Sequence, residues 1–125
     1  MAYSYNSSHK VITAALFIGW AVFHFVTIKD SNLEYENGQK KRVGTVSENK
    51  NNGVWTWYYS NGNKSLSGKF VNGKREGVWT TWDVNGRKTI ECEYANDQLN
   101  GQYIVWDKNN EISVQKTYKN DRLVN

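Results

Sequence analysis

Hydrophobic and polar residues alternate with a period of two in several segments of the chain. In residues 64–71, Leu66, Gly68 and Phe70 fall on one side of an extended chain, and the residues between them are polar. The same alternation returns one repeat later, after about 24 residues, and again near the end of the chain. Alternation of this kind is typical of β-strands with one buried face and one face in water.

Short motifs recur at the same interval as this alternation. Gly53-Val54-Trp55 returns as Gly77-Val78-Trp79 and as Gly101-Gln102-Tyr103; Asn61-Gly62 returns as Asn85-Gly86 and Asn109-Asn110; Asn72-Gly73 returns as Asn96-Asp97 and Asn120-Asp121. Asn-Gly pairs favour chain reversal with positive φ and are a strong hairpin signal. The sequence therefore predicts an all-β fold, a single-layer antiparallel β-meander of hairpin repeats about 24 residues long.

The repeats define one domain, residues 29–125. The expected units lie near 33–52, 53–76, 77–100 and 101–125, with about two strands in each, and the first unit is degenerate. A single hairpin is too small to be stable alone, so each unit is expected to stack its apolar side chains on its neighbours.

An apolar segment precedes the repeats. Residues 1–10 form a short polar tail, and residues 11–28, VITAALFIGWAVFHFVTI, contain no charge. As a helix these 18 residues would span about 27 Å, close to the hydrocarbon thickness of a bilayer. We expect one N-terminal transmembrane helix and a single-pass membrane protein, with a cleaved signal peptide and a buried core helix as the alternatives.

Basic residues are distributed unevenly around this segment. Only Lys10 precedes it, whereas Lys29, Lys40, Lys41 and Arg42 follow it. The positive-inside rule then favours a cytoplasmic repeat domain. In that orientation Lys40, Lys41 and Arg42 are candidates for contact with anionic lipid.

The remaining composition excludes several classes of function. The net charge is +4, but charges of both signs alternate along the chain, which does not indicate a nucleic-acid partner. His9 and His24 both lie in or beside the apolar segment, so the repeats contain no histidine for a catalytic triad or a zinc site. Cys92 takes the place that Gly68 holds one repeat earlier and is interpreted as a small core residue. We expect no enzyme activity, no cofactor, no metal and no small-molecule substrate.

Aromatic residues are the candidate binding groups. The chain has 6 Trp and 8 Tyr, more large rings than a thin sheet hides. Trp55 and its equivalents are expected to pack as the core. The candidates for contact with a partner are Trp57, Tyr58, Tyr59, Trp82 and Trp106. The expected partner is another protein; the alternative is an exported module that binds a glycan or choline through exposed rings.

The repeat motif resembles a known family. Gly53, Trp55, Tyr58, Asn61, Gly62, Gly68, Phe70, Asn72, Gly73 and Gly77 follow the pattern of MORN repeats, most closely the bacterial variant found in YwqK-type antitoxins. The third copy lacks most of the glycines. The resemblance covers about three quarters of the chain. It implies an elongated β-meander and a role as a scaffold, a membrane-associated adaptor or an antitoxin, and it supplies no catalytic residues.

Overall fold

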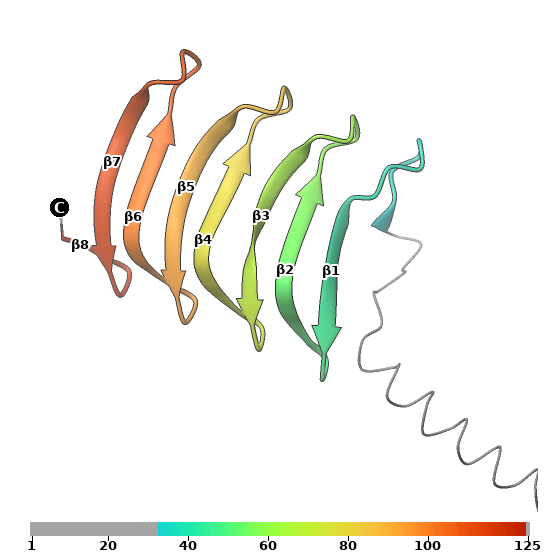
Figure 1. Ribbon diagram of the computed structural model, residues 1–125, viewed down its shortest axis with the longest axis horizontal. Helices are drawn as coiled ribbons and strands as arrows, with labels where there is room; N and C mark the ends of the chain where they lie inside the picture. The colour runs from blue at the N-terminus through green and yellow to red at the C-terminus, as the bar shows by residue number, and fades with distance from the viewer. Residues whose placement is uncertain (1–32, 125) are drawn as a thin grey trace, which may run out of the picture.

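The computed structural model describes residues 33–124, which form one antiparallel sheet. Figure 1 shows the strands side by side in a single layer, each next to its neighbour in sequence. The strands are β1 (Arg42–Ser47), β2 (Lys50–Tyr58), β3 (Lys64–Val71), β4 (Lys74–Trp82), β5 (Lys88–Ala95), β6 (Gln98–Trp106), β7 (Ile112–Lys119) and β8 (Arg122–Leu123). The prediction of an all-β meander of hairpins is confirmed.

Two-residue turns join the strands at one end of the sheet. In the turn between β3 and β4, Asn72 has a φ of 50° and Gly73 a φ of 81°; in the next turn at this end, Asn96 and Asp97 have φ values of 51° and 70°. Two successive residues with positive φ define the type I′ turn, whose twist matches that of antiparallel strands. The sequence motif at this end was therefore interpreted correctly.

Five-residue loops join the strands at the opposite end, and here the structure differs from the expectation. Gly62 has a φ of 89°, but Asn61 is not among the residues with positive φ. Instead, the backbone N–H of Tyr59 donates to the carbonyl of Asn63, and the Asn61 side-chain oxygen accepts the N–H of Asn63. The Asn-Gly pair thus closes a longer loop, in which the amide side chain organises the turn and glycine supplies the left-handed residue.

The core lies on one face of the sheet, where the indole rings of tryptophans pack against the backbone of glycines. Trp55, Trp79 and Cys92 are the buried hydrophobic residues of the described range. A Cβ at Gly44 would overlap the indole of Trp55, and a Cβ at Gly68 would overlap the indole of Trp79. The glycines therefore let each indole lie flat on the backbone of the preceding strand, which buries the ring without a second layer.

Hydrogen bonds and ring contacts extend this core along the sheet. The indole N–H groups of Trp55 and Trp79 donate to the carbonyls of Thr45 and Lys69 at 3.0 and 3.2 Å. Phe70 lies between the two indoles, with its ring centroid 4.9 Å from that of Trp79 and 6.4 Å from that of Trp55. Edge-to-face contacts at these distances add to the stability gained by burial.

In the part of the chain that the structure describes, no helix has the length and apolar character that crossing a bilayer requires. Residues 11–28, on which the predicted anchor depends, lie outside the described residues.

Candidate functional site

Three aromatic residues and three lysines occupy equivalent places at the loop end of the strands. In the sheet register Tyr58 pairs with Lys64, Trp82 pairs with Lys88, and Glu34 pairs with Lys40 in an isolated bridge. Trp106 holds the corresponding place on β6. We call this set the aromatic–lysine row. Its members are Lys40, Tyr58, Lys64, Trp82, Lys88 and Trp106.

A repeated irregularity in strand pairing produces the row. The register shifts between Trp57 and Tyr58, between Thr81 and Trp82, and between Val105 and Trp106. Each shift is a β-bulge, which turns a side chain away from the direction that regular pairing would give it. The bulges bring the lysine that opens β3 or β5 opposite the aromatic residue that closes the strand before it.

Two of the lysines, Lys64 and Lys88, also lie over the aromatic ring of the strand that follows them. Lys64 Nζ is 5.7 Å from the ring centroid of Trp82, and Lys88 Nζ is 5.0 Å from that of Trp106. These distances are within the range of cation–π attraction. Tyr58, Trp82 and Trp106 are half-buried, so part of each ring remains open to solvent.

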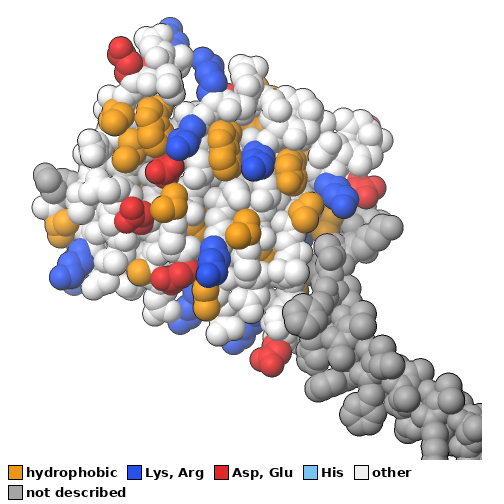
Figure 2. All heavy atoms as spheres, in the orientation of Figure 1, with side chains coloured by type: hydrophobic (Ala, Val, Ile, Leu, Met, Phe, Trp, Pro, Cys, Tyr) orange, Lys and Arg blue, Asp and Glu red, His pale blue; other side chains and the backbone are white. Residues whose placement is uncertain are grey.

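The row crosses the sheet approximately at right angles to the strands. Figure 2 shows basic and hydrophobic side chains alternating in a line near the loop end of the molecule, on a face whose other hydrophobic groups are scattered. The scattered groups include Val54 and Val78, which are 63% and 50% exposed. The line of rings and cations is therefore the most regular feature of this face.

The lysines of the row differ in their electrostatic surroundings. Lys88 Nζ donates to Glu91 Oε2 at 2.8 Å, in an ion pair whose side chains are 42% and 31% exposed. Within residues 33–124, no carboxylate forms an ion pair with Lys64. An exposed ion pair contributes little free energy, so Lys88 can exchange Glu91 for another anion at low cost.

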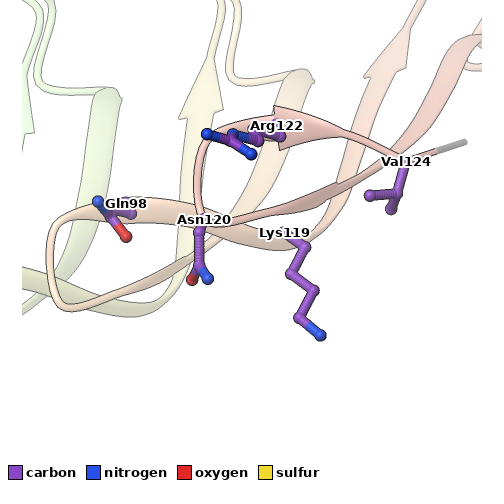
Figure 3. A pocket seen from close by; sticks show the side chains of 5 residues that line it. All are labelled: Gln98, Lys119, Asn120, Arg122 and Val124. Carbon is purple, nitrogen blue, oxygen red and sulfur yellow. The ribbon is translucent and has the colours of Figure 1, made fainter.

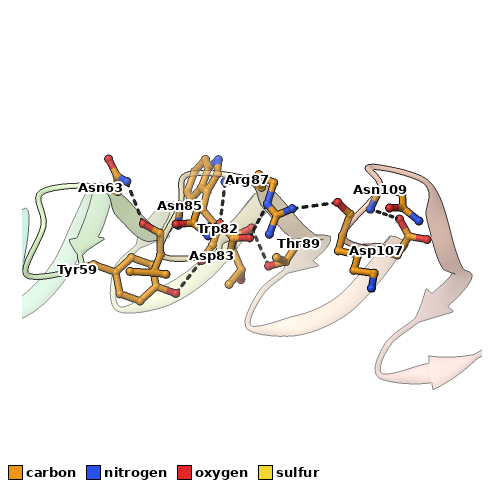
Figure 4. Close-up of polar contacts among 12 residues, drawn as sticks. Tyr59, Asn63, Trp82, Asp83, Asn85, Arg87, Thr89, Asp107 and Asn109 are labelled. Atoms are coloured by element: carbon orange, nitrogen blue, oxygen red, sulfur yellow. Dashed lines mark hydrogen bonds and ion pairs between the residues drawn. The ribbon is translucent and has the colours of Figure 1, made fainter.

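Hydrogen bonds between successive loops hold the row in place (Figure 4). The hydroxyl of Tyr59 donates to the carbonyl of Trp82 at 2.8 Å, and the Asn61 side-chain amide donates to the carbonyl of Val84 at 2.8 Å. In the next repeat, Arg87 performs this function by donating to the carbonyl of Lys108 at 2.9 Å. Each loop is thus tied to the loop one repeat later, which fixes the spacing of the aromatic residues beside them.

Two carboxylates that take part in the turns have lowered pKa values. The pKa of Asp83 is lowered mainly because its carboxylate accepts the backbone N–H of Arg87, with help from the Arg87 guanidinium and the N–H of Asn85. At the opposite end of the sheet, the pKa of Asp97 is lowered mainly by the hydrogen bond from Arg75. Both groups organise turns; Asp83 directly follows Trp82 of the row, and Asp97 lies at the opposite end of the sheet.

The five aromatic candidates lie in three different places: the row, the core face and a loop. Tyr58, Trp82 and Trp106 lie in the row, whereas Trp57 lies on the core face, with its ring centroid 6.0 Å from that of Trp79. The hydroxyl of Tyr59 is engaged in the loop hydrogen bond.

The three basic candidates do not form one patch. Lys40 holds the first place of the row, Lys41 Nζ lies 5.3 Å from the ring centroid of Tyr35, and the guanidinium of Arg42 lies 5.9 Å from the ring centroid of Trp55 on the core face. Lys41 and Arg42 are thus engaged with different rings, because neighbouring residues of an extended chain point in different directions.

The sequence analysis missed Lys64 and Lys88. Both residues open a strand, and together with Lys40 they recur at the interval of the repeat. That interval could have identified them, but their position opposite Tyr58 and Trp82 depends on the bulges, which the pattern of hydrophobic residues does not reveal.

An open hollow of about 650 Å³ lies at the C-terminal end of the sheet, lined by Gln98, Lys119, Asn120, Arg122 and Val124. Figure 3 shows these side chains around the turn between β7 and β8. None of them is aromatic, and the hollow is separate from the row. Among the described residues, no group of three or more His, Cys, Asp or Glu side chains is close enough together to hold a metal ion.

Cys92 lies in the core, opposite Tyr103 on the neighbouring strand. Burial raises the pKa of its thiol above the ordinary value, so the thiol remains protonated at neutral pH. This environment agrees with the interpretation of Cys92 as a core residue.

Comparison of the chain with models of known protein families and with curated proteins finds no match. The fold and the row therefore provide the arguments about function that follow.

Proposed function

We propose that this chain is a binding protein that acts by non-covalent association with another protein, without chemistry of its own and without a cofactor. The observation that carries the proposal is the aromatic–lysine row, in which half-buried rings and exposed cations repeat along one line. Aromatic residues and cations that combine apolar area with directional contacts are typical of binding surfaces.

The proposed place of action is a membrane. In this proposal residues 11–28 form a single-pass anchor, and the excess of basic residues after that segment favours a cytoplasmic sheet. The resemblance of the repeats to MORN repeats supports a scaffold or adaptor role; an antitoxin role would need a toxin as the partner chain.

An exported module that binds choline or a glycan is the second candidate. The half-buried rings of Trp82 and Trp106 support sugar stacking. Choline fits less well, because the ammonium groups of Lys64 and Lys88 already lie over these rings and would compete with a ligand cation. The protein partner is favoured because lysines alternate with the rings along the row.

The proposal is tested by affinity capture of the full-length chain from its native membrane, followed by identification of the bound proteins. Trp82→Ala combined with Lys64→Gln should abolish recovery of the partner, because both changes remove groups of the row. The matched control is Val54→Ser combined with Val78→Ser, which alters exposed residues on the same face and should leave recovery unchanged. Equal recovery with all three chains would show that the row is not the binding surface.

A further inference from the structure

We propose that the aromatic–lysine row binds a proline-rich peptide in the polyproline II conformation, with an acidic residue at every third position. The inference rests on the proposed function, since it names the class of protein segment that the surface would bind. It is argued from the spacing of the row, from the chemistry of its rings and from the charge of its lysines.

The spacing of the row matches the pitch of a polyproline II helix. Tyr58, Trp82 and Trp106 lie on β2, β4 and β6, so successive rings are two strands apart. Two strand spacings amount to about 9.6 Å. A polyproline II helix has three residues per turn and a rise of about 3.1 Å per residue, so side chains on one edge recur about every 9.3 Å. Every third residue of such a peptide can therefore meet a ring of the row.

An extended β-strand peptide fits this spacing less well. Side chains on one face of a strand recur about every 6.7 Å, so a strand with one side chain on the first ring of the row would miss the second ring by about 3 Å and come close again only at the third. A polyproline II peptide also has its conformation before binding, so it loses less conformational entropy when it binds.

The rings of the row resemble the aromatic surfaces on which other proteins bind proline-rich peptides. Proline-rich segments dock on grooves lined by aromatic side chains, because the flat pyrrolidine ring packs on an aromatic face. Trp82 and Trp106 are half-buried, and each is paired with the strand that follows it, so their places in the sheet are fixed before a ligand arrives. A fixed ring reduces the entropy lost on binding.

The lysines of the row define the charge of the partner. Lys64 and Lys88 lie between successive rings and Lys40 precedes the first ring, each about one strand spacing from the nearest aromatic residue. In a polyproline II peptide the other two edges are offset by about 3.1 and 6.2 Å, which brings an acidic side chain within reach of a flexible lysine. The peptide should therefore carry Asp or Glu on the edge next to the edge that meets the rings.

The surrounding charges argue against a broad anionic surface as the occupant. Glu76, Glu91 and Glu93 belong to the same face as the row, by their pairing with Lys69, with Thr80 and with Val78. A bilayer of anionic lipid or a nucleic acid would bring further negative charge against these glutamates. A narrow peptide that follows the row meets only Glu91, whose exposed ion pair with Lys88 it replaces.

The test is a fluorescence titration of the full-length chain, held in zwitterionic nanodiscs, with synthetic peptides. The main probe consists of four Pro-Pro-Glu triplets, which is long enough to cover the row. We expect saturable binding that weakens as salt is added. Four Gly-Ser-Glu triplets keep the charge but lose the helix, and four Pro-Pro-Lys triplets keep the helix but reverse the charge, so both should bind at least about tenfold more weakly.

Variants connect binding to the row. Trp106→Ala should weaken binding of the main probe about tenfold, as expected for removal of an aromatic anchor. Lys64→Gln should weaken it about threefold, and the matched control Lys69→Gln, an exposed lysine on the same strand and face, should leave it unchanged. Thermal unfolding of each variant verifies that the sheet is intact; should Trp106→Ala unfold, the two lysine variants still decide the outcome.

Several outcomes would overturn the inference. These are the absence of saturable binding of the main probe, equal binding of either control peptide, and equal effects of Lys64→Gln and Lys69→Gln. Row-dependent binding to vesicles that contain phosphatidylserine, without peptide binding, would identify a membrane as the occupant instead. If the peptide fails but capture of a protein still depends on the row, only this inference falls; if both fail, the proposed function falls with it.

Discussion

The contact between an indole and a glycine is the smallest unit of stability in this sheet. Trp79 is 5% exposed although no second layer is present in the described part of the chain, because Gly68 leaves room for its ring on the backbone. One repeat later the equivalent pair is Cys92 and Tyr103. Cys92 is larger than Gly68, and the ring of Tyr103 is smaller than that of Trp79. The pair therefore behaves as one packing unit.

Gly68→Cys should destabilise the protein by about 1–3 kcal/mol, because the new side chain overlaps the indole of Trp79. Adding Trp79→Tyr should recover about 1 kcal/mol or more relative to the sum of the single changes, since it reproduces the pair found in the next repeat. Urea unfolding of the single and double variants measures this coupling. Ser65→Cys, on the same strand but away from an indole, is the control, and strict additivity would contradict the packing argument.

The Asp83 carboxylate makes a pH-dependent contribution to stability. Its pKa is lowered in the folded protein, so its contribution is complete above the ordinary value of 3.8 and is lost as the pH falls through the lower folded value. Asp83→Asn keeps an oxygen that accepts the N–H groups of Asn85 and Arg87 but removes the charge. The wild type should be more stable than this variant at neutral pH, and the difference should begin to shrink near pH 3.8 and vanish once the pH is below the lower folded pKa. Unfolding curves at a series of pH values measure this, and a difference that persists in acid would exclude the charge as its cause.

At the level of elements, the loops connect one repeat to the next. The Asn61 side chain donates to the carbonyl of Val84 and accepts the N–H of Asn63, so it stabilises its own loop and the following one. Within residues 33–124, the side chain of the equivalent residue Asn85 donates no such bond; Arg87, the equivalent of Asn63, donates the bond to the next loop. The equivalent asparagines therefore contribute differently to the stability of their repeats.

Asn61→Ala should destabilise the sheet by about 1 kcal/mol, because the backbone N–H of Asn63 loses its acceptor and the carbonyl of Val84 keeps only the Asn63 side-chain amide as a donor. Asn85→Ala is the matched control at the equivalent position and should change the free energy of unfolding by less than about 0.5 kcal/mol. Chemical denaturation of both variants measures the difference. Equal losses would show that the bond to Val84 contributes nothing.

At the level of the whole molecule, the sheet is a one-dimensional stack. Each strand pairs only with its neighbours in sequence, and in the described range β8 is a two-residue strand that pairs with β7 alone. Stability in such a stack is the sum of local terms and nearest-neighbour terms. Interior strands therefore have two stabilising neighbours, and the last strands have fewer.

The protection of backbone amides from hydrogen exchange should be higher in interior strands than in the last strands. Backbone amides of β3, β4 and β5 should be the most protected, and those of β7 and β8 should exchange faster, because opening an end strand breaks one interface and opening an interior strand breaks two. Mass-spectrometric exchange of the full-length chain measures the gradient. Equal protection of β4 and β7 would mean that the sheet opens only as a single cooperative unit.

The amino-acid sequence was sufficient for the architecture. The constant repeat interval, the alternation around Leu66 and the turn at Asn72-Gly73 all predicted hairpins in an antiparallel meander, because strand period and turn chemistry are local properties. It also predicted that Cys92 belongs to the core, since this follows from the same alternation.

Only the tertiary structure decided which residues share a surface. The bulges beside Tyr58 and Trp82 set these rings opposite Lys64 and Lys88. A bulge depends on how two strands pair and twist, so residues far apart in sequence determine it together. The sequence by itself determined the repeated hairpin, because strand period and turn type depend on residues that are close together in the chain. The row formed only when the hairpins paired in one register.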